Sequence, residues 1–169
     1  MGKERKNPIG IIKNYVVKKA GILDFDGMFA LISEWADQYH YDCIEKKHSE
    51  KAGATGAYIE SNWYLERKVS YYVKFIIEIE FLVRDMTPVV VETHEGGKLK
   101  RQKGRVEVIF NSKMQKNYLK NFSDKPGEFS DFIRVIYEKY LAKKRLKDYE
   151  DKLEEESKDF IEEIRAKLD

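Results

Sequence analysis

The chain has 169 residues, of which 42% are hydrophobic, 13% aromatic and 37% charged, and its formal net charge is +2. This length suits one domain with or without a helical extension, and the apolar and aromatic content excludes a disordered chain. No apolar run is long enough to cross a bilayer, and the charged N-terminus lacks the apolar core of a signal peptide. We therefore expect no membrane span and, with Cys43 as the single cysteine, a protein of the reducing cytoplasm.

The first part of the chain predicts a strand followed by a helix. Residues 9–18 are rich in β-branched and aromatic side chains, which favour a strand, and Gly21 is expected to end it. Apolar side chains then recur at helical spacing over residues 28–40 and predict an amphipathic helix. Asp24 or Asp26 is placed to cap its N-terminus, because a carboxylate there accepts hydrogen bonds from free backbone N–H groups.

The middle of the chain predicts an antiparallel sheet. Small and polar residues over 48–56 indicate a loop. Residues 73–83 alternate strictly, with one wholly apolar face, and are typical of a strand that packs one side on a core. Residues 59–65 suggest a neighbouring strand.

Three further strand segments are expected after a turn. Residues 85–88 predict this turn, since Pro88 has no N–H to donate to a neighbouring strand. Glu95–Gly97 then indicates a hairpin between residues 89–91 and 98–103. Alternation over 106–110 predicts the last strand.

The C-terminal part predicts helices after the punctuation at Pro126 and Gly127. The first apolar stripe consists of Phe129, Phe132, Ile133, Ile136, Tyr137, Tyr140 and Leu141. It is interrupted by basic residues 143–145 and resumes sparsely as far as Leu168. An unbroken helix of this length would extend about 60 Å, more than a domain of this size. We expect either a break near 142–146 or a projecting end that finds a partner.

The order of these elements predicts an α+β fold, with an antiparallel sheet, one N-terminal helix and long C-terminal helices. The order is compatible with a helix-grip arrangement, in which a curved sheet wraps the last helix and can leave an apolar cavity. We divide the chain into a sheet domain over 1–125 and a helical segment over 126–169 that packs on the sheet or projects from it.

The segment Gly21–Phe29 resembles the first motif of the haloacid-dehalogenase phosphatases. That resemblance would imply a nucleophile and an acid or base at Asp24 and Asp26. Met28 stands where the family has a hydroxyl residue, however, and no later motif of the family follows. Helix capping explains both aspartates more simply.

A second resemblance covers the blocks Gly21–Asp42, Tyr72–Met86 and Ile133–Leu153. These blocks resemble small uncharacterised proteins of archaeal genomes. The resemblance implies no known activity and offers no functional residues.

One group of residues could ligate a metal. His40, Cys43 and His48 have the spacing H-x-x-C-x4-H, with Asp42 and Glu45 between and beside them, and all five side chains are possible zinc ligands. The alternative is an ordinary helix-to-strand connection in which Cys43 is a small buried hydrophobe. We leave this choice open and predict no cofactor.

Charge is distributed unevenly along the chain. Residues 98–120 carry eight Lys or Arg against one acid, 8 − 1 = +7, whereas residues 148–169 carry four against ten, 4 − 10 = −6. Such clusters can steer partners, and the basic ones can grip phosphates. The candidate binding residues are Lys98, Lys100, Arg101, Lys103, Arg105, Lys143, Lys144 and Arg145.

These features favour a non-enzymatic interaction module, which binds protein or RNA through the basic hairpin and the charged C-terminal helices. A protein partner or self-association along the apolar seam beyond residue 146 is expected first, and nucleic acid second. The alternative is a helix-grip binder of a small apolar ligand. An enzyme is least favoured, because the sequence shows no P-loop and no Ser-His-Asp arrangement.

Overall fold

The computed structural model describes residues 7–119 and 128–169, and for 128–131 the backbone only. The elements in chain order are β1 (Ile9–Leu23), α1 (Phe25–Gln38), β2 (Asp42–Gly53), β3 (Gly56–Lys68), β4 (Val73–Glu92), β5 (Lys98–Lys116), α2 (Glu128–Ile136), the π-helical turn η1 (Tyr137–Leu141) and α3 (Lys143–Leu168). The strands form one sheet in the order β1-β5-β4-β3-β2, and every neighbouring pair is antiparallel. The predicted α+β class is confirmed.

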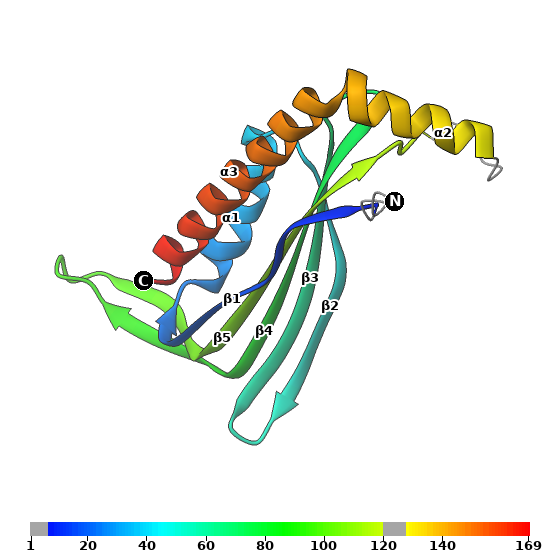
Figure 1. Ribbon diagram of the computed structural model, residues 1–169. Helices are drawn as coiled ribbons and strands as arrows, with labels where there is room; N and C mark the ends of the chain where they lie inside the picture. The colour runs from blue at the N-terminus through cyan, green and yellow to red at the C-terminus, as the bar shows by residue number, and fades with distance from the viewer. Residues whose placement is uncertain (1–6, 120–127) are drawn as a thin grey trace.

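The core lies between the concave face of the sheet and the two helices α1 and α3, which share that face (Figure 1). The apolar face predicted for the central strand is the buried one, and its members are Val73, Phe75, Ile77, Ile79, Phe81 and Val83. The rings of Trp35 and Phe160 stack with centroids 4.0 Å apart, and Phe110 meets Phe160 edge-on. Aromatic stacking therefore joins α1, α3 and β5.

Helix α1 begins where the sequence predicts. Asp24 is the N-cap, and its Oδ1 accepts a hydrogen bond of 3.0 Å from the backbone N of Gly27. Leu23 and Met28, on either side of this cap, are buried in the core. The aspartates of the phosphatase-like segment thus lie at a helix start, as the capping interpretation requires.

The loop predicted over 48–56 is wrong, because residues 42–53 form strand β2. β2 is an edge strand, and most of its side chains are exposed on both faces. An edge strand of this kind has no apolar face to bury, so its sequence lacks the alternation that identifies a strand.

The turn predicted over 85–88 is also wrong. Strand β4 continues to Glu92, and a β-bulge between Arg84 and Thr87 accommodates Asp85 at a φ of 56°. Aspartate adopts this left-handed conformation more readily than most residues do. Strand β4 can therefore continue through residues 85–88, although this sequence is typical of a turn. Pro88 then sits opposite Gln102 in the pairing with β5. The predicted hairpin is confirmed, and Thr93 N donates to Gly97 O at its turn.

The C-terminal helices break at Ala142, as expected for 142–146. Beyond this break the apolar stripe of α3 faces the chain's own sheet, and its buried members are Leu146, Leu153, Phe160, Ile161, Ile164 and Leu168. The apolar seam beyond residue 146, which was expected to bind a partner, is therefore covered by the chain's own sheet. The expected boundary at 125/126 lies outside the described residues.

Candidate functional site

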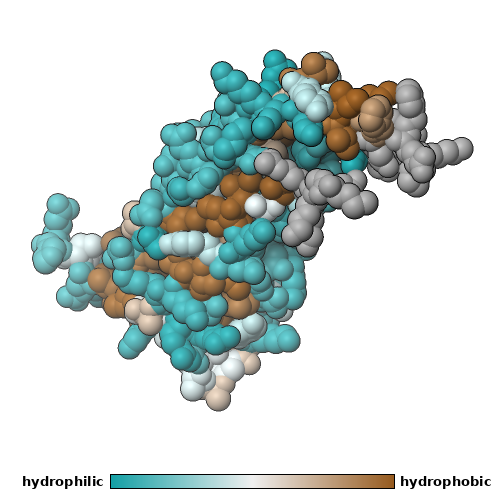
Figure 2. Space-filling view, in the orientation of Figure 1, coloured by the Kyte–Doolittle hydropathy of each residue, from teal (hydrophilic) through white to brown (hydrophobic). Residues whose placement is uncertain are grey.

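A short helical arm carries six of the thirteen exposed large apolar side chains of the described chain. We call α2 and η1, residues 128–141, the apolar arm; Figure 1 shows it extending beyond the ends of the strands. Its exposed large apolar side chains are Phe132, Ile133, Val135, Ile136, Tyr140 and Leu141. Figure 2 shows brown atoms gathered at this end, against teal along α3. Tyr140 and Leu141 are 70% and 77% exposed, although both would normally favour burial.

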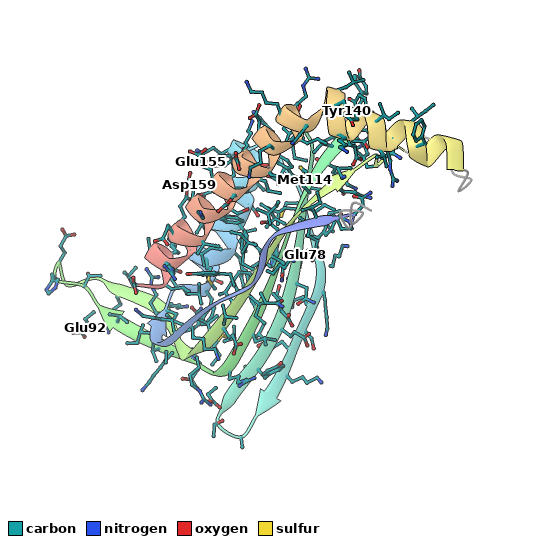
Figure 3. The ribbon with its side chains drawn as sticks, viewed as in Figure 1. Glu78, Glu92, Met114, Tyr140, Glu155 and Asp159 are labelled. Carbon is teal, nitrogen blue, oxygen red and sulfur yellow. The ribbon has the colours of Figure 1, made fainter. Side chains whose placement is uncertain are left out.

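The π-helical turn keeps these side chains on one side of the arm. Phe132 and Ile136 are four residues apart in α2 and lie one above the other. A π-helix needs more residues for each turn, so η1 brings Tyr140 back almost onto the same line. The turn closes with a 2.9 Å hydrogen bond from Ala142 N to Tyr137 O. The result is a continuous apolar face, with Tyr140 at its α3 end, labelled in Figure 3.

A buried polar latch attaches the arm to the sheet. Lys116, only 5% exposed at the end of β5, donates to Glu138 Oε2 of η1 at 2.5 Å. The hydroxyl of Tyr72 donates to the other oxygen of Glu138, and its ring meets Tyr137 edge-on. Burial, followed by the neighbouring Glu138, raises the pKa of Tyr72. The arm is therefore anchored through η1 and carries its apolar face outward.

A basic cluster directly follows the arm. Three of the predicted binding residues, Lys143, Lys144 and Arg145, are exposed at the start of α3. None of them forms an ion pair with any residue that the structure describes. Lys139 within η1 is exposed too, and Lys147 pairs with Asp151 at 2.7 Å. We call Lys139, Lys143, Lys144, Arg145 and Lys147 the basic cluster.

The other five predicted binding residues lie on β5, in the hairpin at the opposite end of the molecule (Figure 1). Two of them have partners within the chain. Arg105 pairs with Asp85 of the bulge, and Arg101 lies 3.8 Å from the capping carboxylate of Asp24. Lys98, Lys100 and Lys103 are exposed. The eight residues therefore form two separate basic surfaces. The one in the hairpin adjoins three exposed large apolar side chains, Ile22, Val90 and Leu99, and the one beside the arm adjoins six.

The possible metal ligands are not brought together. His40 lies in the turn after α1, with a φ of 60°, and Cys43 is half-buried on β2. Burial raises the pKa of the Cys43 thiol. His48 Nδ1 lies 2.9 Å from Glu45 Oε1, which also accepts a 2.6 Å hydrogen bond from Ser61 Oγ. Within residues 7–119 and 128–169, no three His, Cys, Asp or Glu side chains form a group suited to a metal ion.

The sequence does not reveal this Ser61–Glu45–His48 group, because Ser61 reaches the other two residues only through the pairing of β2 with β3. Ser61 is fully buried, so its hydroxyl is out of reach of a substrate. The group therefore gives no reason to expect nucleophilic catalysis.

A second buried network was also invisible in the sequence. Arg67 of β3 donates to both carboxylate oxygens of Glu156 of α3, at 2.8 and 2.9 Å. Tyr41 donates to the same carboxylate at 2.8 Å, and the guanidinium of Arg67 lies 4.6 Å from the centre of the Tyr41 ring. Burial raises the pKa of Tyr41, and the Glu156 carboxylate adds to the effect. The network links α3 to the sheet and is structural.

The convex face of the sheet is a mixed-charge surface around Glu78 and Glu80 of β4. Lys113 pairs with Glu78 at 2.6 Å, and Lys46 lies over the ring of Tyr64. Figure 3 places Glu78 on the sheet and Glu155 and Asp159 on α3. These charged side chains suit a solvated surface better than paired acid–base chemistry.

No protein-family model matches the chain, and no curated protein matches it either. None of the helices in the described part of the chain is both long and apolar enough to span a membrane. Function must accordingly be inferred from the surface, and the apolar arm with its basic cluster is its most distinctive feature.

Proposed function

We propose that the protein is a non-enzymatic interaction module, which engages its partner through the apolar arm and the adjoining basic cluster. The observation that carries this proposal is the exposure of six large apolar side chains on one short projecting element. Contiguous apolar surface of this kind is uncommon on a protein that acts alone and usually marks a binding surface.

Burial of the exposed apolar side chains of the arm by a partner is energetically favourable. Complete burial of a large apolar side chain contributes about 1.5–3 kcal/mol. Phe132, Tyr140 and Leu141 are each at least 60% exposed, so a partner that covers them has several such contributions to gain. The latch through Glu138 holds the arm in place before binding, which reduces the entropy lost when a partner docks.

The basic hairpin is the weaker candidate for the main contact. Arg101 and Arg105 already lie beside carboxylates of the same chain, and few large apolar side chains accompany them. A polyanion such as RNA would suit this hairpin, and RNA binding there ranks second to binding through the arm.

The test is isolation of the protein from its host under native conditions, followed by native mass spectrometry of whatever remains bound. The wild type is compared with the double variant Tyr140→Ser, Leu141→Ser. The matched control is Lys98→Glu, Lys100→Glu, Lys103→Glu, which changes only exposed side chains of the hairpin.

We expect bound protein or lipid on the wild type and on the hairpin variant, and its loss from the arm variant. Melting temperatures should agree among the three proteins, since all five substituted side chains are exposed. Identical spectra for wild type and arm variant would refute the proposal.

A second candidate follows from the helix-grip arrangement considered for the sequence, in which a curved sheet wraps the last helix. In that arrangement a small apolar ligand lies between the sheet and the last helix. The side chains of Trp35, Phe110 and Phe160 occupy that space here and stack on one another. A small molecule that stays bound in native spectra of the arm variant would favour this candidate over the first.

A further inference from the structure

We infer that the partner of the apolar arm is the surface of a lipid bilayer that contains anionic lipids. This inference rests on the proposed function and names the chemistry of what the arm binds. It follows from three properties of the arm's end of the molecule: its apolar side chains, its unpaired basic residues and the charge of the helix beyond them.

The apolar side chains are of the kind that enters the interfacial layer of a bilayer. The face defined above combines aliphatic residues with Phe132 and Tyr140, on a helix that projects clear of the sheet. Tyrosine is favoured at this depth, because its ring is apolar and its hydroxyl remains in contact with water. A helix with such a face lies in the plane of the interface with the face buried among the lipids.

Two more exposed apolar side chains lie in segments next to the latch. Tyr71, in the turn between β3 and β4, is 85% exposed, and the adjacent Tyr72 contacts η1 through Tyr137 and Glu138. Leu119, just after β5, is half-exposed and follows Lys116 of the latch. Exposed apolar side chains thus occur in each of the three parts of the chain that meet at the latch.

The basic cluster supplies charge complementarity. Residues 139–147 contain five Lys or Arg and no acid, 5 − 0 = +5. Lys143, Lys144 and Arg145 are exposed and have no carboxylate partner in the described chain, so their charges are available to lipid phosphates. Basic residues next to an interfacial helix are attracted to anionic headgroups, and they add to the apolar contribution.

The next stretch of α3 has the opposite charge and sets the orientation. Residues 148–159 contain two Lys against seven Asp or Glu, 2 − 7 = −5. Their exposed carboxylates, such as Glu155 and Asp159, line the outer side of α3. An anionic surface attracts the start of α3 and repels its middle, so the arm faces the lipid and the acidic part of α3 points away.

The experiment is co-sedimentation of the full chain with vesicles of phosphatidylcholine alone or with about 30% phosphatidylglycerol, at low and at high salt. Three variants accompany the wild type. The first is Tyr140→Ser, Leu141→Ser, and the second is Lys143→Glu, Lys144→Glu, Arg145→Glu. The third, Lys98→Glu, Lys100→Glu, Lys103→Glu, makes the same change of charge at the opposite end of the molecule.

We expect the wild type and the hairpin variant to bind the anionic vesicles, and to bind less at high salt. Each of the first two variants should bind at least about tenfold more weakly, because it loses apolar insertion or three attracted charges. In Tyr140→Trp, the new indole should shift its fluorescence to shorter wavelength on binding. A protein that only touched the vesicle electrostatically would show no such shift.

The inference fails if the wild type does not bind anionic vesicles, or if the hairpin variant loses as much binding as the basic-cluster variant. Should a protein complex or a dimer nevertheless depend on Tyr140 and Leu141, the lipid assignment falls and the interaction module stands. Should the arm variant match the wild type in both experiments, both proposals fall.

Discussion

The two parts of the C-terminal helical segment are both amphipathic, but only one of them buries its apolar stripe. Both α3 and the apolar arm carry apolar side chains at helical spacing. The stripe of α3 is buried on β1, β5 and α1, whereas the arm has passed beyond the strands and exposes its stripe. The comparison teaches that amphipathicity identifies the side of a helix that needs covering, and that the position of the sheet decides whether the same chain covers it.

The largest expected effect is on the free energy of unfolding, which should respond strongly to substitution of Phe160 and weakly to substitution of Phe132. Phe160→Ala should lower the free energy of unfolding by about 3–5 kcal/mol, because it leaves a cavity between Trp35 and Phe110. Phe132→Ala should lower it by no more than about 0.5 kcal/mol, since Phe132 is mostly exposed. Urea denaturation monitored by circular dichroism measures both. Comparable losses would mean that the arm packs on the molecule as tightly as α3 does.

The next effect concerns ion pairs along α3. Glu156→Ala leaves the guanidinium of Arg67 without its carboxylate in a largely buried site, and we expect a loss of about 3 kcal/mol in the free energy of unfolding. The control is Glu154→Ala, which removes an exposed pair with Lys158 and should cost about 0.5 kcal/mol or less. A small loss for Glu156→Ala would show that the network does not hold α3 on the sheet.

The latch allows a local test of the arm. Glu138→Ala leaves the ammonium of Lys116 and the hydroxyl of Tyr72 buried without their acceptor, at a cost of about 1–3 kcal/mol. Hydrogen exchange measured by mass spectrometry should become faster in residues 132–141 and stay the same in α3 from Leu153 onward. Lys139→Ala, an exposed neighbour, is the control. Equal acceleration along both helices would contradict a latch that is local to the arm.

The smallest effect depends on pH. Burial raises the pKa of Tyr72 above its ordinary value of 10.0, so the folded protein keeps a proton that the unfolded chain loses. The corresponding stability is complete below about pH 10 and is lost as the pH rises through the raised pKa. The free energy of unfolding should therefore fall as the pH rises above about 10, and that of Tyr72→Phe should fall less steeply. Tyr41, whose pKa burial also raises, contributes in the same direction, and a decline unchanged by Tyr72→Phe would assign the effect elsewhere.

Much of the fold was predictable wherever one face of an element is buried. The alternation of β4, the stripe of α1 and its Asp24 cap all arise from local periodicity and local hydrogen bonds. The predictions over 48–56 and 85–88 were wrong for a common reason. An exposed edge strand and a β-bulge are stabilised by backbone pairing with a neighbouring strand, and pairing leaves little trace in side-chain pattern.

The candidate site was predictable only in its parts. The apolar stripe over 132–141 and the basic residues 143–145 were both visible as patterns. The exposure of these side chains could not be predicted, because a buried apolar stripe and an exposed one have the same sequence pattern. The latch could not be found either, since Lys116 and Glu138 are 22 residues apart and each resembles an ordinary surface charge in the sequence.

The sequence by itself determined the α+β class, an aspartate cap at the start of α1 and the hairpin at Gly97, because each depends on residues close together in the chain. Only the tertiary structure decided which amphipathic helix is covered, where the basic residues gather and which charges are buried. Those properties depend on how far each helix and side chain lies from the sheet. The pairing of strands that are far apart in the chain sets this distance.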